Sequence, residues 1–348
     1  PLTAFLLRPI LAPMLTAGNG VRWMQAGLIA VALALLAYPM ATSIPTIALV
    51  RVLHGAGFAT LVSAAVALLV HFIPKERSAQ GFGVFSVAAQ LPYAVMPLLV
   101  EALLPWAGSE ARVYAAASIL ALPPFGLLAL LRRRLGAGLH ENPLARAARP
   151  SLAELLENLR HPAVLGFLTV NLLLFLAHTT VFFFMKDFCL KMGEGDVGFF
   201  FTISSAVMIA VRLVGGRLLD RIEKRVGLFV SMGALALGFL CLGRLASPHL
   251  LYPLAAWYGL CVGVIMPLLN ASIFLASRPD LRGLNSNLML FMMDAGFFLA
   301  PIVGGAMLAM GYSVATLFLG CASLCLVNMA TLCVLMRLEA RRRRGEWR

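Results

Sequence analysis

Long apolar runs separated by short polar breaks extend over nearly the whole chain. A helix that crosses a bilayer needs about 20 apolar residues. On this criterion the pattern predicts eleven apolar segments, the first of them partial, at 1–15, 22–42, 46–73, 79–104, 111–131, 162–190, 195–219, 226–245, 249–276, 285–309 and 313–336. Pro74, Pro105 and Pro248 fall at segment ends, where proline can stop a helix without removing a hydrogen bond inside it. The pattern therefore predicts an all-α membrane protein.

An offset of 204 residues recurs between the first and second parts of the chain. It relates four pairs of residues at matching places within apolar segments, namely Arg8 and Arg212, Gly55 and Gly259, Pro97 and Pro301, and Gln90 and Asp294. We interpret the chain as two copies of one membrane unit. Pro1 matches Ser205, which lies inside a predicted helix of the second copy, and that copy begins near His161. The first copy is therefore expected to lack its first helix and part of its second, so that the complete arrangement would have twelve helices in two sets of six.

Composition supports a membrane protein, and the distribution of charge indicates an orientation. Of the 348 residues, 61% are hydrophobic and 12% are charged, and the mean hydropathy is +0.91, which leaves too little polar surface for a water-soluble globule. The net charge of +13 does not indicate nucleic-acid binding, because the cations lie in short loops and not on one face of a soluble domain. One set of alternate loops holds Arg22, Lys75, Arg77, 132–134, Arg146, Arg149, Arg160, Arg278, Arg282 and 341–344, whereas the other set holds Arg112, Lys186, Lys191 and Arg244. The positive-inside rule then places the first set in the cytoplasm.

The longest polar stretch divides the chain into domains. We expect an N-terminal helical bundle at 1–131, a cytoplasmic linker at 132–160, a C-terminal bundle at 161–337 and a basic cytoplasmic tail at 338–348. Within the linker, Ser151 and Glu154 have the spacing of a capping box. Leu152, Leu155, Leu156 and Leu159 then fall on one face, which predicts a short amphipathic helix on the membrane surface. A simple linker and a regulatory site are both compatible with this segment.

A dense cluster of charge between two apolar runs carries a family resemblance. The stretch Gly216-Arg217-Leu-Leu-Asp220-Arg221-Ile-Glu223-Lys224-Arg225 reads as a short hairpin and resembles the cytoplasmic G-x-x-x-D-R-x-G-R-R signature of the major facilitator superfamily, with Glu223 at the second glycine. Arg51-Val-Leu-His54-Gly55-Ala-Gly57 resembles the R-x-x-x-G-x-G pattern of that family's fourth helix. The resemblance covers essentially the whole chain. It implies two six-helix bundles related by a pseudo-two-fold axis.

The resemblance also implies roles for individual residues. In the family the hairpin acid and nearby arginines form a cytoplasmic contact, so we expect Asp220 to pair with basic residues at neighbouring helix ends. Thr16 stands at the matching place in the first copy, which predicts an asymmetric contact. Arg51 matches an arginine that the family associates with proton coupling. Ala300-Pro301-Ile-Val-Gly304-Gly305 resembles the G-P-x-x-G-G pattern of proton-coupled exporters, where the pattern lies in the fifth helix. Here that helix reads Gln90-Leu-Pro92-Tyr-Ala-Val-Met-Pro97.

Charged residues inside apolar segments are candidates for function, because each is costly in hydrocarbon unless it is paired or hydrated. Asp294 lies about ten residues into its segment, or ~15 Å deep, near the middle of the bilayer. We predict that it is the principal titrating residue, with a permanent Asp294–arginine pair as the structural alternative. Arg8 and Arg212 are nearer to the cytoplasmic ends, where they can snorkel or hold the hairpin. Glu101 is either a solvated carboxylate or a gate.

The candidate site residues form three sets. The proton-coupling candidates are Asp294, Arg51, Glu101 and His178. The candidates for a solute cavity are Gln90, Tyr93, Asn171, Phe182, Trp257, Tyr258, Asn270 and Phe291. The cytoplasmic gating hairpin comprises Arg212, Gly216, Arg217, Asp220, Arg221, Lys224 and Arg225. The structural alternatives are that the aromatic residues face lipid and that His178 is a hydrogen-bonded packing residue.

These observations together predict a secondary transporter, not an enzyme. It would move a small organic solute across the cytoplasmic (inner) membrane by alternating access. Proton-coupled export is the leading hypothesis, and proton-coupled uptake is the alternative. A membrane-embedded transferase is the less favoured alternative, because it would need a compact catalytic cluster and the sequence offers none near a loop. The chain also lacks G-x-x-x-x-G-K-[ST], so coupling to a nucleotide would need another subunit. The scattered cysteines read as apolar packing residues. We expect no cofactor and no metal, a solute, protons and the lipid bilayer as partners, and a monomer. A chain that begins at Pro1 is not expected to transport by itself.

Overall fold

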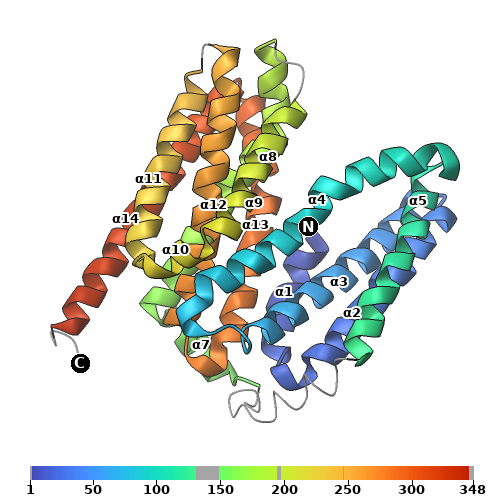
Figure 1. The fold of residues 1–348 in the computed structure, drawn as a ribbon, viewed down its shortest axis with the longest axis horizontal. Coiled ribbons are helices and arrows are strands. Elements are labelled where there is room, and N and C mark those ends of the chain that lie inside the picture. The colour runs from blue at the N-terminus through green and yellow to red at the C-terminus, as the bar shows by residue number, and fades with distance from the viewer. Residues whose placement is uncertain (1, 131–148, 194–196, 246, 345–348) are drawn as a thin grey trace. The chain divides into compact units, whose positions relative to one another are not determined.

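The computed structural model describes residues 2–130, 149–193, 197–245 and 247–344, and within them the chain is helical without a β-strand (Figure 1). Nine helical stretches in this described part are long and apolar enough to span a membrane. The shorter α1 and the 30-residue α4 complete the eleven predicted segments. The helices are α1 Leu2–Met14, α2 Ala17–Ala37, α3 Ile44–Leu69, α4 Ser78–Ala107, α5 Glu110–Ala117, α7 Leu152–Arg160, α8 Pro162–Lys191, α9 Val197–Val214, α10 Gly216–Arg221, α11 Lys224–Gly243, α12 Leu251–Ala276, α13 Arg282–Ala309 and α14 Val314–Arg343.

Two predicted segments are interrupted in the structure. The segment predicted at 195–219 is divided into α9 and α10 at Gly215, because glycine stabilises a helix interior poorly. The segment predicted at 111–131 contains a 3₁₀ turn, Ser118–Ala121, directly before the next helical turn. Pro123 and Pro124 lack the N–H groups that would continue an α-helical ladder through this turn. The predicted positions of these segments are correct, but their continuity is not.

The helices form two compact units, and each unit includes a short segment from the other half of the sequence. Unit 1 comprises Pro1–Ile73, Gln90–Leu155 and Ser277–Asp294, and unit 2 comprises Pro74–Ala89, Leu156–Ala276 and Ala295–Arg348. The boundaries fall inside α4 and α13, which begin at Ser78 and Arg282 and are thus separated by the repeat offset of 204. Each unit therefore contains helices of one sequence copy together with the first turns of a helix from the other copy.

Glycines allow the helices within each unit to approach closely. In unit 1, α2 lies alongside α3 and α5 (Figure 1). A Cβ at Gly27 would lie 2.7 Å from Leu61 N, and one at Gly57 would lie 2.9 Å from Val31 N. In unit 2, a Cβ at Gly259 of α12 would overlap the carbonyl oxygen of Ser204 on α9. Small residues at helix contacts supply packing where lipid removes the hydrophobic drive, and these glycines allow the helix backbones to touch.

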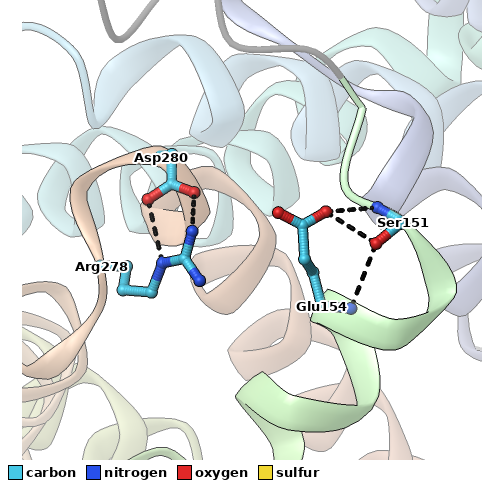
Figure 2. Close-up of polar contacts among 4 residues, drawn as sticks. All are labelled: Ser151, Glu154, Arg278 and Asp280. Carbon is cyan, nitrogen blue, oxygen red and sulfur yellow. Dashed lines mark hydrogen bonds and ion pairs between the residues drawn. The ribbon is translucent and has the colours of Figure 1, made fainter.

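The linker helix α7 has the predicted cap (Figure 2). The backbone N–H and the hydroxyl of Ser151 both donate to Glu154 Oε2 at 2.8 Å, and the Glu154 N–H donates to Ser151 Oγ at 3.3 Å. These hydrogen bonds, with a smaller effect from the Arg278 guanidinium, lower the pKa of Glu154. Leu155 packs against Ala12, Leu281 and Leu284 in unit 1. The helix and its capping box are confirmed, whereas residues 132–148 of the predicted linker lie outside the described part of the chain.

Replacing Ser151 with alanine is expected to fray the first turn of α7. The variant loses the hydroxyl that caps the Glu154 N–H and removes one donor that favours the ionised carboxylate. Because the folded pKa of Glu154 is lowered, its contribution to α7 is present at neutral pH and lost as pH falls through that pKa. Hydrogen exchange of 152–160 should be several-fold faster in Ser151→Ala, with a weaker dependence on acid. Ser109→Ala, which removes the cap of α5, is the control and should leave α7 unchanged.

Candidate functional site

One face of α13 carries polar groups in an otherwise apolar helix. Asn287, Phe291 and Asp294 are spaced by four and three residues, so they lie on the same side of the helix. Asp294 is only 6% exposed, and Asn287 is fully buried. The Phe291 ring stacks on Phe5 of α1 with the ring centroids 4.9 Å apart. This face of α13 therefore packs against α1 within unit 1.

Arg8 of α1 is the partner of Asp294. Its side chain is 0% exposed, and its Nε donates to Asp294 Oδ2 at 2.5 Å. Its Nη1 donates to Ser63 Oγ on α3 at 3.2 Å, and Asn287 Nδ2 donates to the Ser63 carbonyl at 3.1 Å. We call Arg8, Ser63, Asn287 and Asp294 the Arg8 cluster. It joins three helices, α1 and α3 from the first sequence copy and α13 from the second.

This arrangement bears on two arginines that the sequence singled out. Arg8 was expected to snorkel or to hold the hairpin, but it is buried because Asp294 supplies a counter-ion inside the helix packing. Arg51 was predicted, like Asp294, to be a proton-coupling candidate. It is exposed on α3, with its guanidinium 5.5 Å from the centroid of the Tyr38 ring. Arg51 precedes Ser63 by 12 residues on the same helix, a rise of about 18 Å.

His178 belongs to an aromatic group in unit 2. Its Nδ1 shares a 2.5 Å hydrogen bond with the hydroxyl of Tyr258, and the two rings are stacked with centroids 5.9 Å apart. Tyr258 is 4% exposed and also contacts the rings of Phe200 and Phe239. The structure thus brings together two candidates that the sequence placed 80 residues apart. The hydrogen bond satisfies the polar groups of the buried Tyr258 and the half-buried His178.

The other cavity candidates lie on several helices. Trp257 Nε1 donates to the Ala234 carbonyl at 2.8 Å, and Asn270 Nδ2 donates to Met266 of its own helix at 2.9 Å. Asn171 is buried on α8, Gln90 is half-buried on α4, Glu101 is exposed on α4, and Phe182 is exposed on α8 beside the rings of Phe183, Phe201 and Phe297. Tyr93 lies on α4, outside the described side chains. Their assembly into one solute cavity stays a prediction.

The hairpin acid caps the first turn of α4 within unit 2. Asp220 Oδ1 accepts from the N–H of Ala79 at 2.8 Å, and Oδ2 accepts from the N–H of Gln80 at 3.3 Å. These amides belong to the helix N-terminus, where backbone donors have no intrahelical partner and the helix dipole favours an anion. Lys224 Nζ donates to the carbonyls of Leu219, Asp220 and Ile222. The carboxylate therefore binds backbone amides of α4, whereas the sequence predicted basic side chains as its partners.

The remaining hairpin residues have different surroundings. Arg225 forms an ion pair with Glu339 of α14, and its guanidinium lies 5.9 Å from the centroid of the Phe167 ring on α8. It therefore ties α11 to two neighbouring helices. Arg212 and Gly216 are buried, whereas Arg217 and Arg221 are exposed. Only part of the predicted hairpin set is thus engaged in helix packing.

Repeat-related residues meet in both units. In unit 2, a Cβ at Gly83 of α4 would lie 3.6 Å from the Arg212 carbonyl and 3.8 Å from the Pro267 ring. The offset of 204 converts Gly83, Arg212 and Pro267 into Asn287, Arg8 and Ser63. The same three repeat positions therefore make the α13–α1–α3 contact in unit 1 and the α4–α9–α12 contact in unit 2. We call the first the polar junction and the second the glycine–proline junction.

A repeated set of membrane helices, a charged hairpin and a buried ion pair between the copies define a multi-pass membrane protein of the transporter class. The chain belongs to the Major Facilitator Superfamily, whose family model matches residues 1–299 and 190–347. The chain is 33% identical to the Enterobactin exporter EntS of Shigella flexneri over 122 residues. This match spans 33% of the chain and 30% of the exporter's length.

Solved structures of the same superfamily share the fold. A bacterial homologue of the iron transporter ferroportin, in an outward-facing state, has a TM-score of 0.73 at 12% identity, with 95% of this chain and 87% of that chain covered. The transporter FucP, in the outward conformation, has a TM-score of 0.71 at 14% identity with the same two coverages. The predicted fold class is therefore confirmed, and members of this family transport small solutes.

Proposed function

We propose that the protein is a proton-coupled secondary transporter that exports a small organic solute across the cytoplasmic membrane by alternating access. The observation that carries the proposal is the buried carboxylate of Asp294, which is paired with Arg8 inside a span. A charged side chain inside the hydrocarbon is costly, and residues of this kind commonly mark ion or proton pathways. The linker 132–160 and the tail 338–348 would then be cytoplasmic, and the protein would work as a monomer of two bundles, 1–131 and 161–337.

The chemistry of Asp294 suits proton coupling. Burial disfavours an ionised carboxylate, whereas a nearby guanidinium favours it. A change in helix contacts that moves Arg8 away from Asp294 therefore favours proton uptake, and its return favours proton release. His178, Arg51 and Glu101 remain secondary candidates, and the side chains predicted to line the cavity would bind the solute near the middle of the bilayer.

Export is favoured over uptake by the similarity to the Enterobactin exporter. The same fold also occurs in a fucose:proton symporter of E. coli, so uptake is the alternative. Enterobactin is a suitable first probe, followed by solutes that accumulate in cells without the gene. In proteoliposomes, an antiporter takes up external solute when the interior is acidic, whereas a symporter does so when the exterior is acidic. Uptake with an acidic interior is expected. Solute flux that does not respond to either pH gradient would overturn proton coupling, and the absence of flux for every probe in a twelve-helix protein would overturn the transport proposal.

A further inference from the structure

A series of aromatic side chains extends over α8, α9 and α13 within unit 2. On α8, Phe175, His178 and Phe182 are spaced by three and four residues, so they lie on one face of the helix. The Phe297 ring of α13 lies 6.2 Å from the rings of Phe175 and Phe182, measured between centroids. The Phe201 ring of α9 lies 6.0 Å from that of Phe182. We call these five residues the aromatic face.

The rest of the described chain covers the aromatic face only in part. Phe175 is 9% exposed, whereas Phe182 is 50% exposed, and His178, Phe201 and Phe297 are half-buried. His178 follows the first residue of the 30-residue α8 by 16 positions, so it lies about 24 Å along a helix that spans the bilayer. A surface of this kind inside a span is covered either by lipid chains or by a bound molecule.

Tyr258 determines which ring nitrogen of His178 carries the proton. Tyr258 is 4% exposed, and its hydroxyl has one hydrogen bond among the described residues, to His178 Nδ1 at 2.5 Å. If Nδ1 were the donor, the hydroxyl hydrogen would be buried without an acceptor, which is costly. The hydroxyl therefore donates to Nδ1, and the neutral imidazole carries its proton on Nε2.

The Nε2 atom of His178 is a hydrogen-bond donor that lacks a partner in the described part of the chain. It is not one of the fully buried atoms without a partner, so a bound molecule can reach it. Lipid chains contain no acceptor and would leave this N–H unsatisfied. Arg212, which is buried on α9, interacts electrostatically with His178, and its positive charge favours an anion nearby. These polar groups favour a solute with an acidic oxygen over lipid.

We propose that the aromatic face binds an aromatic carboxylate, whose ring packs beside Phe182 and Phe297 and whose carboxylate accepts a hydrogen bond from His178 Nε2. Aromatic rings prefer offset or edge-to-face contacts with one another, which favours an aromatic solute over a saturated one of equal charge. Tyr258 is a positioning residue, because it acts through the tautomer of His178. This inference rests on the proposed transport function and names the class of solute.

Equilibrium binding of radiolabelled benzoate to the purified full-length protein in nanodiscs tests the proposal, with empty nanodiscs used to subtract partition into lipid. Cyclohexanecarboxylate keeps the charge without the aromatic ring, and it should compete about two- to tenfold less well than benzoate. Benzyl alcohol keeps the ring without the carboxylate, and it should compete about tenfold less well. Equal competition by the three compounds, or no saturable binding of benzoate, would overturn the proposal.

Substitutions separate the polar and the aromatic parts of the site. His178→Phe removes the N–H but keeps a ring, and it should weaken benzoate binding roughly ten- to 100-fold. His178→Gln keeps an amide donor and should restore part of that affinity. Phe182→Ala should weaken the binding of benzoate more than that of cyclohexanecarboxylate. His249→Phe and Phe199→Ala change exposed residues of unit 2 outside the aromatic face, so these controls should bind benzoate like the unmodified protein.

Tyr258→Phe distinguishes positioning from a purely structural role. The variant keeps the ring but loses the hydroxyl donor, so the imidazole proton can occupy either nitrogen. The preference for benzoate over benzyl alcohol should then fall by a few-fold, whereas a purely structural effect would leave this preference unchanged. An unchanged preference would overturn the tautomer and the proposal with it. Should His178→Phe fail to fold, this variant decides.

The outcomes also distinguish this binding site from the proposed function. Benzoate binding with the expected ranking, but without any flux in a pH gradient, would support the site and contradict proton-coupled transport. Gradient-driven flux of another solute that is unaffected by His178→Phe and Phe182→Ala would contradict the site and leave the proposed function standing.

Discussion

Asp294→Asn is expected to abolish pH-driven solute accumulation while exchange of labelled for unlabelled solute survives. Asparagine has nearly the size of aspartate but cannot ionise, so alternation of access can continue without a proton. Solute exchange needs only the binding site and that alternation. In proteoliposomes the accumulation ratio should fall to that of liposomes without a pH gradient. Counterflow should stay within a few-fold of the unmodified protein.

The control for this substitution is the repeat-equivalent residue. Gln90→Asn changes a side chain at the matching position of α4 without changing charge. Because Gln90 is also a cavity candidate, the comparison uses the response to the pH gradient, which should stay intact, and not the affinity for solute. Asp294→Asn also leaves Arg8 buried without a counter-ion, a loss of about 3–5 kcal/mol for a broken buried pair. Thermal stability is therefore measured in parallel, and Asp294→Glu tests whether a carboxylate restores coupling. A normal accumulation ratio in Asp294→Asn would show that another group carries the proton.

The helices and the repeat could be predicted because both have local signatures. A bilayer requires long apolar runs, and the offset of 204 recurs at Arg8 and Arg212 and at three further pairs of residues. The same offset relates the starts of α4 and α13, the two helices that cross the unit boundaries. Glycine and proline commonly interrupt helices, so the break at Gly215 and the 3₁₀ turn before Pro123 have recognisable signals in the sequence. The continuous apolar runs around these residues were nevertheless predicted as unbroken segments.

The partner of Asp294 could not be predicted, because the two residues are 286 positions apart and their contact depends on how α1 packs against α13. Arg51 was named because it matches an arginine of the family, and such a match does not indicate which face of a helix meets which neighbour. One signal was available. Asn287 and Asp294 are seven residues apart in an apolar helix and so share a face, and the offset relates Asn287 to Gly83, a position of close packing.

The chemistry of the hairpin was half predicted. Asp220 was identified as the residue that fastens the hairpin, and the structure shows that it does bind a neighbouring helix. Basic side chains were expected as its partners because charge is visible in a sequence. The actual donors are the N–H groups of Ala79 and Gln80. A helix N-terminus offers such donors at every residue except proline, so composition gives little sign of them.

Asp220→Leu is expected to uncap α4 and to slow transport without removing the protein from the membrane. The substitution removes both acceptors of the Ala79 and Gln80 amides and the charge that complements the helix dipole. Loss of a helix N-cap costs about 0.5–2 kcal/mol, which changes the ratio of bound to released hairpin by roughly two-fold to 30-fold. Asp220→Asn keeps one acceptor oxygen and should have an intermediate effect.

Hydrogen exchange of the first turn of α4 measures this directly. The amides of Ala79 and Gln80 should exchange slowest in the unmodified protein, faster in Asp220→Asn and fastest in Asp220→Leu. Transport rates should fall along the same series if the hairpin contact stabilises one access state. Asp280→Asn is the matched control, because it neutralises another aspartate near a helix start whose partner is the exposed Arg278 (Figure 2). The expected result is a change confined to α4 and the hairpin. Unchanged exchange at these two amides, together with unmodified transport rates in Asp220→Leu, would show that the cap contributes nothing to the balance of access states.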